Sequence, residues 1–322
     1  MTTVTGTSGV VEVTELASGL RFPEGPVAMP DGSIVLVEIA RGTLTRVAPD
    51  GTTRIVAQLG GGPNGAAPGP DGRIYVTNNG GLTFHERDGR LSPGYTPDDA
   101  PNGWIDAVDL ASGKVERLYE HPADVTPRAP NDLVFDRHGG FWFTDLGKTF
   151  RGQPQRDRGA VYYATPDGRS IRRVIFPLEG PNGIGLSPDG GTLYVAETIT
   201  GRLWAYQVTG PGEIGRGGGT VPWERGKLLW AAGYYSLLDS LAVDAAGNVC
   251  VADIPHGGIT VISPDGTRIE QYPMPDPVTT NICFGGPDMK TAYVTLSSTG
   301  RLVSLPWPRA GLVLQNAGAV SR

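Results

Sequence analysis

The sequence predicts an all-β fold, a six-bladed β-propeller with a metal site on its central axis, and three observations lead to that prediction. The chain has 48 glycines and 28 prolines among 322 residues, and its longest stretch without either is the 13 residues Tyr234–Ala246. Long helices are therefore excluded, and many short strands joined by tight turns are favoured. A turn tripeptide and a polar tripeptide each recur six times, which is the pattern of a repeat architecture.

The turn tripeptide is Pro-Asp-Gly. Proline fixes φ, the aspartate side chain bonds back to its own backbone and glycine accepts a positive φ, so each copy suits a tight turn between strands. Apolar runs flank the copies, such as Ile34–Val37 and Leu193–Val195, and their β-branched and aromatic side chains are typical of buried strands. The copies are residues 30–32, 49–51, 70–72, 166–168, 188–190 and 264–266.

The polar tripeptide precedes an apolar strand in each repeat, and we expect it to open the innermost strand of a blade. Its central residues are separated by 40, 67, 51, 57 and 42 positions, a period typical of blades with four short strands. Six copies predict six blades in one domain, residues 1–322, with insertions at Gly80–Gly103 and Gly210–Tyr235. Pro101-Asn102-Gly103 counts as a chance copy, and Val10–Val13 is expected to close the ring by joining the last blade. The copies are Pro23-Glu24-Gly25, Pro63-Asn64-Gly65, Pro130-Asn131-Asp132, Pro181-Asn182-Gly183, Leu238-Asp239-Ser240 and Thr280-Asn281-Ile282.

Because innermost strands line the axis, the central residues of the six copies should converge there, on the face opposite the Pro-Asp-Gly turns. Oxygen-bearing side chains without Cys or His suit one hard divalent cation; Ca²⁺ is the one they favour, with Mg²⁺, Zn²⁺, Mn²⁺ or Fe²⁺ as alternatives. The competing interpretation is that these residues only cap the strand starts, although turn chemistry does not require an acid or amide in every blade. The six residues are Glu24, Asn64, Asn131, Asn182, Asp239 and Asn281.

Three segments resemble the senescence marker protein/gluconolactonase (regucalcin-like) family: Phe22-Pro-Glu-Gly-Pro26, Ala129-Pro-Asn-Asp-Leu133 with Phe141-Trp-Phe-Thr-Asp145, and Gly180-Pro-Asn-Gly-Ile184 with Tyr194-Val-Ala-Glu-Thr198. The resemblance runs from about residue 18 to 305. It implies a six-bladed propeller with one catalytic divalent metal on the axis and, commonly, lactone hydrolysis. The metal ligands that it implies are Glu24, Asn131, Asn182 and Asp239.

The resemblance therefore implies a gluconolactonase-like carboxylic ester hydrolase acting on a small-molecule lactone. A bound metal would polarise the ester carbonyl and acidify a water, and the resemblance places the catalytic carboxylate, our expected general base, at Asp239. Animal-type sugar lactonases of the family have an arginine where this chain has Ala129, with Arg128 beside it, which argues against sugar-acid specificity. Two alternatives stay open: a phosphotriesterase with Asp239 as nucleophile, and a non-catalytic metal-binding or interaction propeller.

A second group of candidates surrounds this set. The ends of the second strands carry Glu38, Asn79, Asp145, Glu197 and Asp253, expected to hold loop backbone and ligand side chains rather than the metal. Asn64 and Asn281 complete the axial ring or contact substrate, and His85 and His256 lie in loops on the same face. Loops 82–104 and 148–158 are expected to shape the substrate pocket and are candidates for a lid.

Charge and cysteines limit the partners. The net charge of −6, the pI of about 5.3 and the lack of a basic cluster disfavour nucleic-acid binding. The sequence contains no stretch of 18 apolar residues that would predict a membrane span, and residues 1–9 lack the pattern of a leader peptide. A cytoplasmic protein is therefore expected. Cys250 and Cys283 lie in apolar runs and are expected to be buried, reduced thiols. The sequence indicates no oligomeric state.

Overall fold

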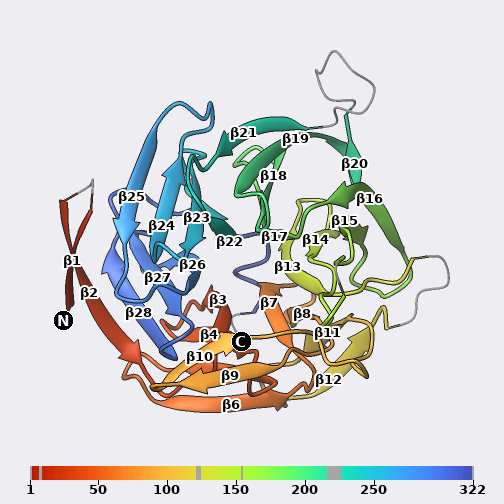
Figure 1. The fold of residues 1–322 in the computed structure, drawn as a ribbon, viewed down its shortest axis with the longest axis horizontal. Helices are drawn as coiled ribbons and strands as arrows, with labels where there is room; N and C mark the ends of the chain where they lie inside the picture. The colour runs from red at the N-terminus through yellow and green to blue at the C-terminus, as the bar shows by residue number, and fades with distance from the viewer. Residues whose placement is uncertain (1, 7–8, 121–124, 154, 216–225, 321–322) are drawn as a thin grey trace.

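The computed structural model describes residues 2–6, 9–120, 125–153, 155–215 and 226–320, and every regular element in these ranges is a β-strand. Six sheets are arranged around a central axis, as Figure 1 shows, so the predicted six-bladed β-propeller is confirmed. The described residues include no helix with the length and apolar character needed to cross a membrane.

The first three blades each have four antiparallel strands, which run in order from the axis outward. Blade 1 comprises β3 (Pro23–Ala28), β4 (Ile34–Glu38), β5 (Thr43–Val47) and β6 (Thr53–Gln58). Blade 2 comprises β7 (Pro63–Pro68), β8 (Ile74–Asn78), β11 (Trp104–Val108) and β12 (Val115–Leu118). Blade 3 comprises β13 (Pro130–Phe135), β14 (Phe141–Asp145), β15 (Gly159–Ala164) and β16 (Ile171–Leu178).

The other three blades follow the same order, and two of them carry extra strands. Blade 4 comprises β17 (Pro181–Leu186), β18 (Thr192–Glu197), β19 (Arg202–Gly210) and β21 (Lys227–Ala231), with the short β20 (Glu213–Ile214) beside β19. Blade 5 comprises β22 (Leu237–Val243), β23 (Val249–Ile254), β24 (Gly258–Ile262) and β25 (Ile269–Pro273). Blade 6 comprises β26 (Thr279–Gly285), β27 (Thr291–Leu296), β28 (Arg301–Pro306), β2 (Gly9–Ala17) and β1 (Thr2–Gly6).

All six Pro-Asp-Gly turns lie on one face of the propeller, which we call the turn face. Each joins the first strand of a blade to the second, or the third to the fourth; residues 30–32 link β3 to β4, for example, and residues 49–51 link β5 to β6. The glycine of every copy has a φ between 68° and 85°, a region that side chains other than glycine rarely adopt. The polar tripeptides therefore open the first strands on the opposite face, which we call the motif face.

The N-terminal segment closes the ring, as expected, but through different residues. The predicted closing segment Val10–Val13 pairs with β1, whereas β2 pairs with β28 four residues later, through Thr14, Glu15 and Ala17. Hydrophobic clusters lie between adjacent blades; the one between blades 2 and 3 includes Tyr75 and Phe141.

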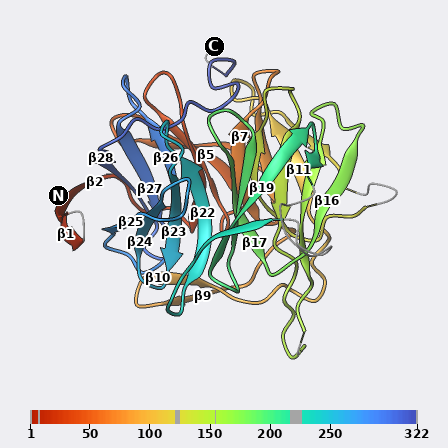
Figure 2. The ribbon, with the colours of Figure 1, turned by 90° about the horizontal axis from the view of Figure 1, so that it is seen from above.

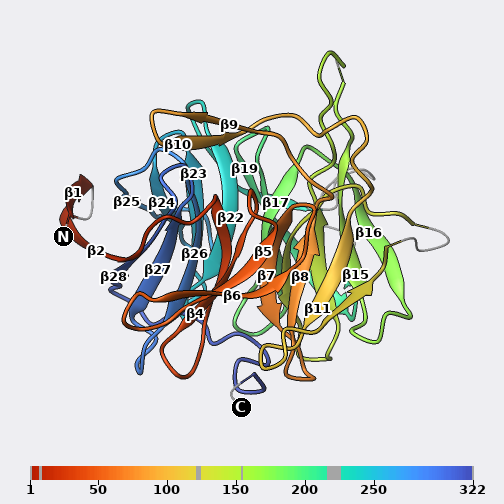
Figure 3. The same ribbon diagram turned by 90° about the horizontal axis from the view of Figure 1, so that it is seen from below.

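The C-terminal tail, residues 307–320, crosses the turn face. The backbone N–H of Leu312 donates to the carbonyl of Val243 in blade 5 (3.1 Å), and Asn316 Nδ2 donates to the carbonyl of Pro68 in blade 2 (3.3 Å). Buried Val320 then packs against the apolar side chains of blades 1 and 2. The chain end consequently lies near the centre of the ring in Figure 1 and at the opposite end of the molecule from β9 and β10 in Figures 2 and 3.

Candidate functional site

The first strand of every blade leaves its regular pairing at the polar tripeptide. In blade 3, Pro130 pairs with Asp145 and Leu133 with Phe143, so that Asn131 and Asp132 together face the single residue Thr144. Such a bulge bends the strand and re-aims its side chains. Register shifts at the corresponding place in the other five blades give every blade the same irregularity beside the axis.

Threonines of the second strands hold these irregular segments across the blade boundaries. Thr144 Oγ1 accepts the N–H of Asp132 (3.1 Å) and donates to the carbonyl of Asn182 in the next blade (2.5 Å). Thr77 in blade 2 makes the same pair of bonds with the N–H of Gly65 (2.8 Å) and the carbonyl of Asn131 (2.5 Å). The backbone of the two predicted asparagine ligands is therefore fixed by the preceding blade.

The polar residues at the ends of the second strands hold the loops that lead into the first strands. Asp145 accepts the backbone N–H groups of Arg128 (2.6 Å), Ala129 (2.8 Å) and Gly147 (3.0 Å). Glu38, Glu197 and Asp253 bind the corresponding loops at Arg21, Glu179 and Ser236. In blade 2 this position is Asn78 rather than the predicted Asn79: Asn78 Oδ1 accepts from the N–H of Gly62, and Asn79 Oδ1 from that of Gly81.

Replacing Asp145 with alanine should lower the free energy of unfolding by about 3 kcal/mol or more, because three buried or part-buried N–H groups lose their acceptor. Chemical denaturation of the purified variant measures this change. Asp265→Ala, in an exposed Pro-Asp-Gly turn, is the control and should cost about 1 kcal/mol or less. Equal losses in the two variants would mean that Asp145 does not support the loop.

The predicted metal ligands open the first strands of blades 1, 3, 4 and 5 on the motif face. Glu24, Asn131 and Asn182 are buried, and Asp239 is partly buried. Glu24 Oε2 accepts from the N–H of Gly25 (2.9 Å) and from Asn281 Nδ2 (2.8 Å). Asn182 Nδ2 donates to Thr198 Oγ1 (3.2 Å). In contrast, Asn131 Oδ1 is buried and has no hydrogen-bond partner among the described residues.

Carboxylates accumulate beside the axis. Burial raises the pKa of Glu24, and it raises the pKa of Asp239 well above the usual range, with the charge of Glu24 as the next cause. Burial, followed by the charge of Glu24, also raises the pKa of Asp132 to about 8, and Asp132 in turn raises that of Asp239. The charge of one carboxylate therefore disfavours the ionised form of the others.

The residues present fit a hard divalent cation. Buried oxygens that repel one another, next to an amide oxygen with no partner, are the environment that a +2 ion would stabilise. Among the described residues no three His, Cys, Asp or Glu side chains form a compact ligand cluster; the predicted set contains only two carboxylates and takes its other two ligands from amides. Those residues are Glu24, Asn131, Asn182 and Asp239.

One of the six predicted axial residues, Asn281, differs from the sequence interpretation. In blade 6, Thr279 pairs with Leu296 and Asn281 with Thr295, so Thr280 rather than Asn281 takes the position of Asn131. Asn281 corresponds instead to Asp132, and each of the two side chains accepts the N–H of its own successor, at 2.8 and 2.9 Å. Asn281 therefore contacts the site through Glu24, from one layer further toward the turn face.

Sequence reasoning did not select Asp132 as a site residue. Its position in the tripeptide is glycine in blades 1, 2 and 4, and an acid that replaces a repeated glycine is the signal that could have identified it. The glycines have a steric reason: a Cβ at Gly65 would lie 2.7 Å from the backbone of Asn131 and Asp132, and one at Gly183 would lie 2.7 Å from the Asp239 carbonyl oxygen. The first strands thus approach closely around the axis.

The insertion in blade 2 forms a wall over part of the motif face. It folds into the hairpin β9 (Phe84–Arg87) and β10 (Arg90–Pro93), which Figures 2 and 3 place on the side away from the C-terminus. Phe84 stacks on Phe22 of blade 1, and the N–H of Leu91 donates to the carbonyl of Ser298 in blade 6 (2.8 Å).

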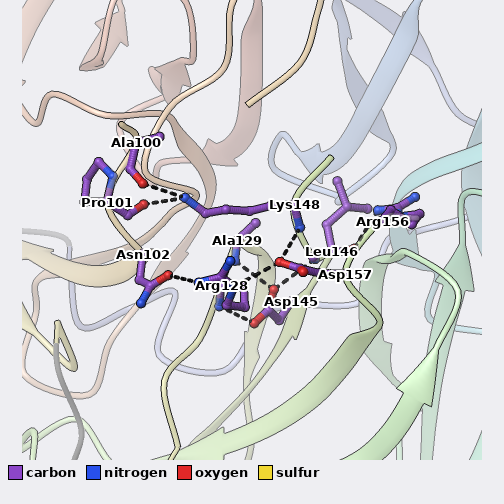
Figure 4. Close-up of polar contacts among 11 residues, drawn as sticks. Ala100, Pro101, Asn102, Arg128, Ala129, Asp145, Leu146, Lys148, Arg156 and Asp157 are labelled. Atoms are coloured by element: carbon purple, nitrogen blue, oxygen red, sulfur yellow. Dashed lines mark hydrogen bonds and ion pairs between the residues drawn. The ribbon is translucent and has the colours of Figure 1, made fainter. Parts of the chain in front are cut away.

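The same insertion is joined to the loop after β14, as Figure 4 shows. Buried Lys148 donates through Nζ to the carbonyls of Ala100 (3.3 Å) and Pro101 (2.5 Å), and burial lowers its pKa. Arg128 donates to Asn102 Oδ1 (2.5 Å) and to Asp157 Oδ2 (2.9 Å). Loops 82–104 and 148–158 thus hold each other in place, apart from residue 154, which lies outside the described residues.

Three other candidates have separate surroundings. Asn64 is buried at the start of β7 and shares the position of Asn131 in the bulge. His85 is exposed on β9 next to Phe84, the residue that faces the propeller body. His256 is exposed, stacks edge-on against Tyr234 (4.4 Å between ring centres), and its Nε2 lies 3.1 Å from the carbonyl of Tyr235. Because a carbonyl only accepts, Nε2 carries the proton in this contact.

The raised pKa of Asp132 predicts an unusual pH dependence for the metal-free protein. Between its usual value of 3.8 and about 8, the folded state retains a proton that the unfolded state has lost, so a rising pH destabilises the fold. Tm measured in chelator should therefore be higher for Asp132→Asn than for the unchanged protein, by an amount that grows from pH 5 to pH 8. A difference that stays constant would contradict the expectation.

Comparison with known proteins shows the family to which this chain belongs. Residues 22–298 match the family described as SMP-30/Gluconolactonase/LRE-like region. A lactonase drp35 of Staphylococcus epidermidis is 30% identical over 247 residues, 76% of this chain and 67% of that protein. One of Staphylococcus haemolyticus is 34% identical over 190 residues, 59% of this chain and 54% of that protein, so the match spans little more than half the length of that relative.

Solved structures share the fold. The gluconolactonase of Xanthomonas campestris superimposes with a TM-score of 0.71 and 23% identity, covering 92% of this chain and 90% of that one. A calcium-binding regucalcin from Agrobacterium tumefaciens gives a TM-score of 0.69 and 20% identity, covering 94% and 95%. The family match includes the first strands of all six blades and covers most of the sequence. The chain therefore belongs to the SMP-30/gluconolactonase/LRE-like family.

Proposed function

We propose that this protein is a divalent-metal-dependent lactonase that opens a small cyclic ester by attack of water, with Asp239 as general base. The main support is the buried Asn131 Oδ1, which has no partner among the described residues and belongs to the same axial set as Glu24 and Asp239. Relatives named lactonase drp35 support the reaction class, and the neighbour named a calcium-binding regucalcin supports Ca²⁺ as the cation.

Each residue of the set has a role in this proposal. Glu24, Asn131, Asn182 and Asp239 would hold the cation, which when bound polarises the ester carbonyl and stabilises the charge that develops on its oxygen. Glu24 is fixed by the N–H of Gly25 and by Asn281, so it serves as the stationary anionic ligand.

Asp239 receives the proton of the attacking water on a carboxylate oxygen. It is less buried than Glu24. Without metal, burial and then the charge of Glu24 raise the pKa of Asp239, and a bound cation would favour the ionised carboxylate that accepts the proton. Asn182 donates a side-chain hydrogen bond to it that opposes part of this increase. The same proton can then be given to the ring oxygen as it leaves, so the base is restored after each turnover.

The test is proton release from a panel of lactones, from aldonolactones to alkyl γ- and δ-lactones, at neutral pH. The protein is assayed as purified, after chelation, and after adding back Ca²⁺, Mg²⁺, Mn²⁺ or Zn²⁺ one at a time. Hydrolysis that is lost with chelator and restored by one cation would support both the reaction and the metal. A protein that binds the cation but hydrolyses none of the lactones would refute the proposal.

A further inference from the structure

A cavity of about 910 Å³ occupies the turn-face half of the axis, away from the proposed active site. All six blades contribute to its wall, and the tail residues Leu312 and Leu314 form part of it. In Figure 1 the dark-blue tail passes across the centre of the ring. Its volume is within the range of pockets that bind small molecules.

The wall of the cavity is mainly apolar. Below the layer of Asp132 and Asn281, the first strands present a ring of aliphatic side chains, including Leu133, Ile184 and Leu241. Apolar side chains also surround the wider part nearer the turn face, among them Phe135, Leu186, Phe284 and Met289. An apolar space of this kind favours hydrocarbon over water.

Polar groups gather at one end of the cavity, at the turn of blade 3. Trp142 lines the cavity and is fully buried, yet its indole N–H has no hydrogen-bond partner within the described ranges. Exposed Arg137 and His138 line the same end, and a Cβ placed on Gly190 would lie 2.5 Å from the Arg137 guanidinium. The cavity thus extends outward between blades 3 and 4.

The acids at this end already have partners. Asp136 accepts from Tyr163 OH (3.0 Å) and from the N–H of His138 (2.8 Å), and Asp31 pairs with Arg46. Asp189, the acid whose charge Arg137 faces, accepts from Ser187 (2.5 Å) and from the N–H of Gly191 (3.0 Å). Among the described residues, the groups that remain to receive a ligand at this end are the Trp142 N–H, the Arg137 guanidinium and the His138 ring.

We propose that this cavity binds a carboxylate with a hydrocarbon chain. The carboxylate accepts from Arg137 and, after a shift of the side chains that cover the buried indole, from Trp142 Nε1, while the chain lies along the axis among the aliphatic side chains. The opposite orientation is unfavourable, because the inner end of the cavity carries Asp132 and Asn281 and offers the carboxylate no cationic partner among the lining residues. The carboxylate position, at the turn of blade 3, is separate from the lactone site on the motif face, and its occupancy is measured without turnover.

Binding of dodecanoate below its micellar concentration tests the proposal, by calorimetry on the full-length protein. Dodecanoate should bind with micromolar affinity, and butyrate and dodecanol at least about tenfold more weakly, because each lacks one of the two recognition elements. Arg137→Gln should weaken dodecanoate binding about tenfold and leave dodecanol unchanged. Arg169→Gln is the matched control, since Arg169 is exposed in another turn of blade 3 and does not line the cavity.

Trp142→Phe should weaken dodecanoate binding several-fold. Its control is Trp307→Phe, because Trp307 is also buried with an unpartnered indole N–H among the described residues but does not line the cavity. Dodecanoate affinity that is unchanged in both Arg137→Gln and Trp142→Phe would overturn the assignment of the carboxylate position. Undetectable dodecanoate binding to the unchanged protein would overturn the proposal as a whole.

A second readout needs no variant. Cys283 lines the cavity, whereas Cys250 is completely buried and does not line it. Burial raises the pKa of the Cys283 thiol to about 12. Because only the thiolate reacts, alkylation is followed over hours at alkaline pH. Dodecanoate should slow the alkylation of Cys283 by iodoacetamide at least about fivefold, as measured by mass spectrometry. An unchanged rate in the presence of saturating dodecanoate would place the ligand elsewhere and overturn the proposal.

Discussion

Replacing Asp239 with asparagine is expected to lower kcat for lactone hydrolysis by about a thousandfold. Asparagine preserves the size of the side chain and one of its oxygens, so a cation can still be held, but the amide cannot take a proton from water. The measurement is kcat on the best lactone of the panel at saturating Ca²⁺. Bound metal is determined on the same samples, because a loss of activity without a loss of metal is the expected signature of a missing base.

Asp253→Asn is the matched control, since Asp253 lies in the same blade and binds Ser236 and Tyr234 instead of facing the axis. It should reduce kcat less than tenfold. The pH profile gives a further criterion: the rise of kcat with pH that reports the base should be absent in Asp239→Asn. If that variant retains kcat within tenfold and keeps the same profile, another group takes the proton.

The fold could be predicted from the sequence because its signals are local. Each Pro-Asp-Gly turn needs only three residues, and the structure places every copy between strands on one face. Ring closure depends instead on pairing between the two ends of the chain, which no local pattern determines. The prediction that an N-terminal strand closes the ring was correct. The residues that pair with the last blade were predicted wrongly, as Val10–Val13 instead of Thr14–Ala17, because no local pattern sets that pairing.

The candidate site, like the fold, was predictable where its signal is local and unpredictable where it depends on contacts between distant segments. The repeat selected six axial positions, and the family resemblance narrowed them to Glu24, Asn131, Asn182 and Asp239. The structure places these four at the starts of first strands on a common face. Asn281 was aligned one position too early, since the bulge that sets its register is visible only in the pairing with β27. The role of Asp132 depends on a charge from another blade, which the sequence does not bring near it.

The cavity on the turn face could not be predicted from the sequence at all. Its wall combines all six blades with the tail, and the feature that gives it chemical character, the unpartnered N–H of Trp142, is the absence of a contact within the described residues. The sequence run Phe141-Trp142-Phe143 reads only as a buried strand. A missing hydrogen bond becomes visible when every neighbour has been placed in three dimensions.

Asn131→Ala should have opposite effects on the metal-free and the metal-bound protein. Without metal, the substitution removes a buried oxygen that has no partner among the described residues, so the free energy of unfolding should stay unchanged or rise by up to about 1 kcal/mol. With Ca²⁺, a ligand is lost, and the affinity should fall at least about tenfold, the loss that removal of even an outer-sphere partner causes. The measurements are chemical denaturation in chelator and a Ca²⁺-binding isotherm.

Asn182→Ala separates this effect from the general cost of truncating an axial asparagine. Asn182 donates to Thr198 (3.2 Å) and accepts from Ser240 (3.4 Å), so its loss should destabilise even the metal-free protein, by about 1 kcal/mol. Both variants should weaken Ca²⁺ binding, but only Asn131→Ala should leave the free energy of unfolding of the metal-free protein undiminished. If the two variants were equally destabilised without metal, Asn131 would have a hydrogen-bond partner in the fold, and its oxygen would not be free to bind a cation. The change in the free energy of unfolding of metal-free Asn131→Ala thus decides between two roles for Asn131. No loss indicates a metal ligand, and a loss indicates a residue that only caps the strand start.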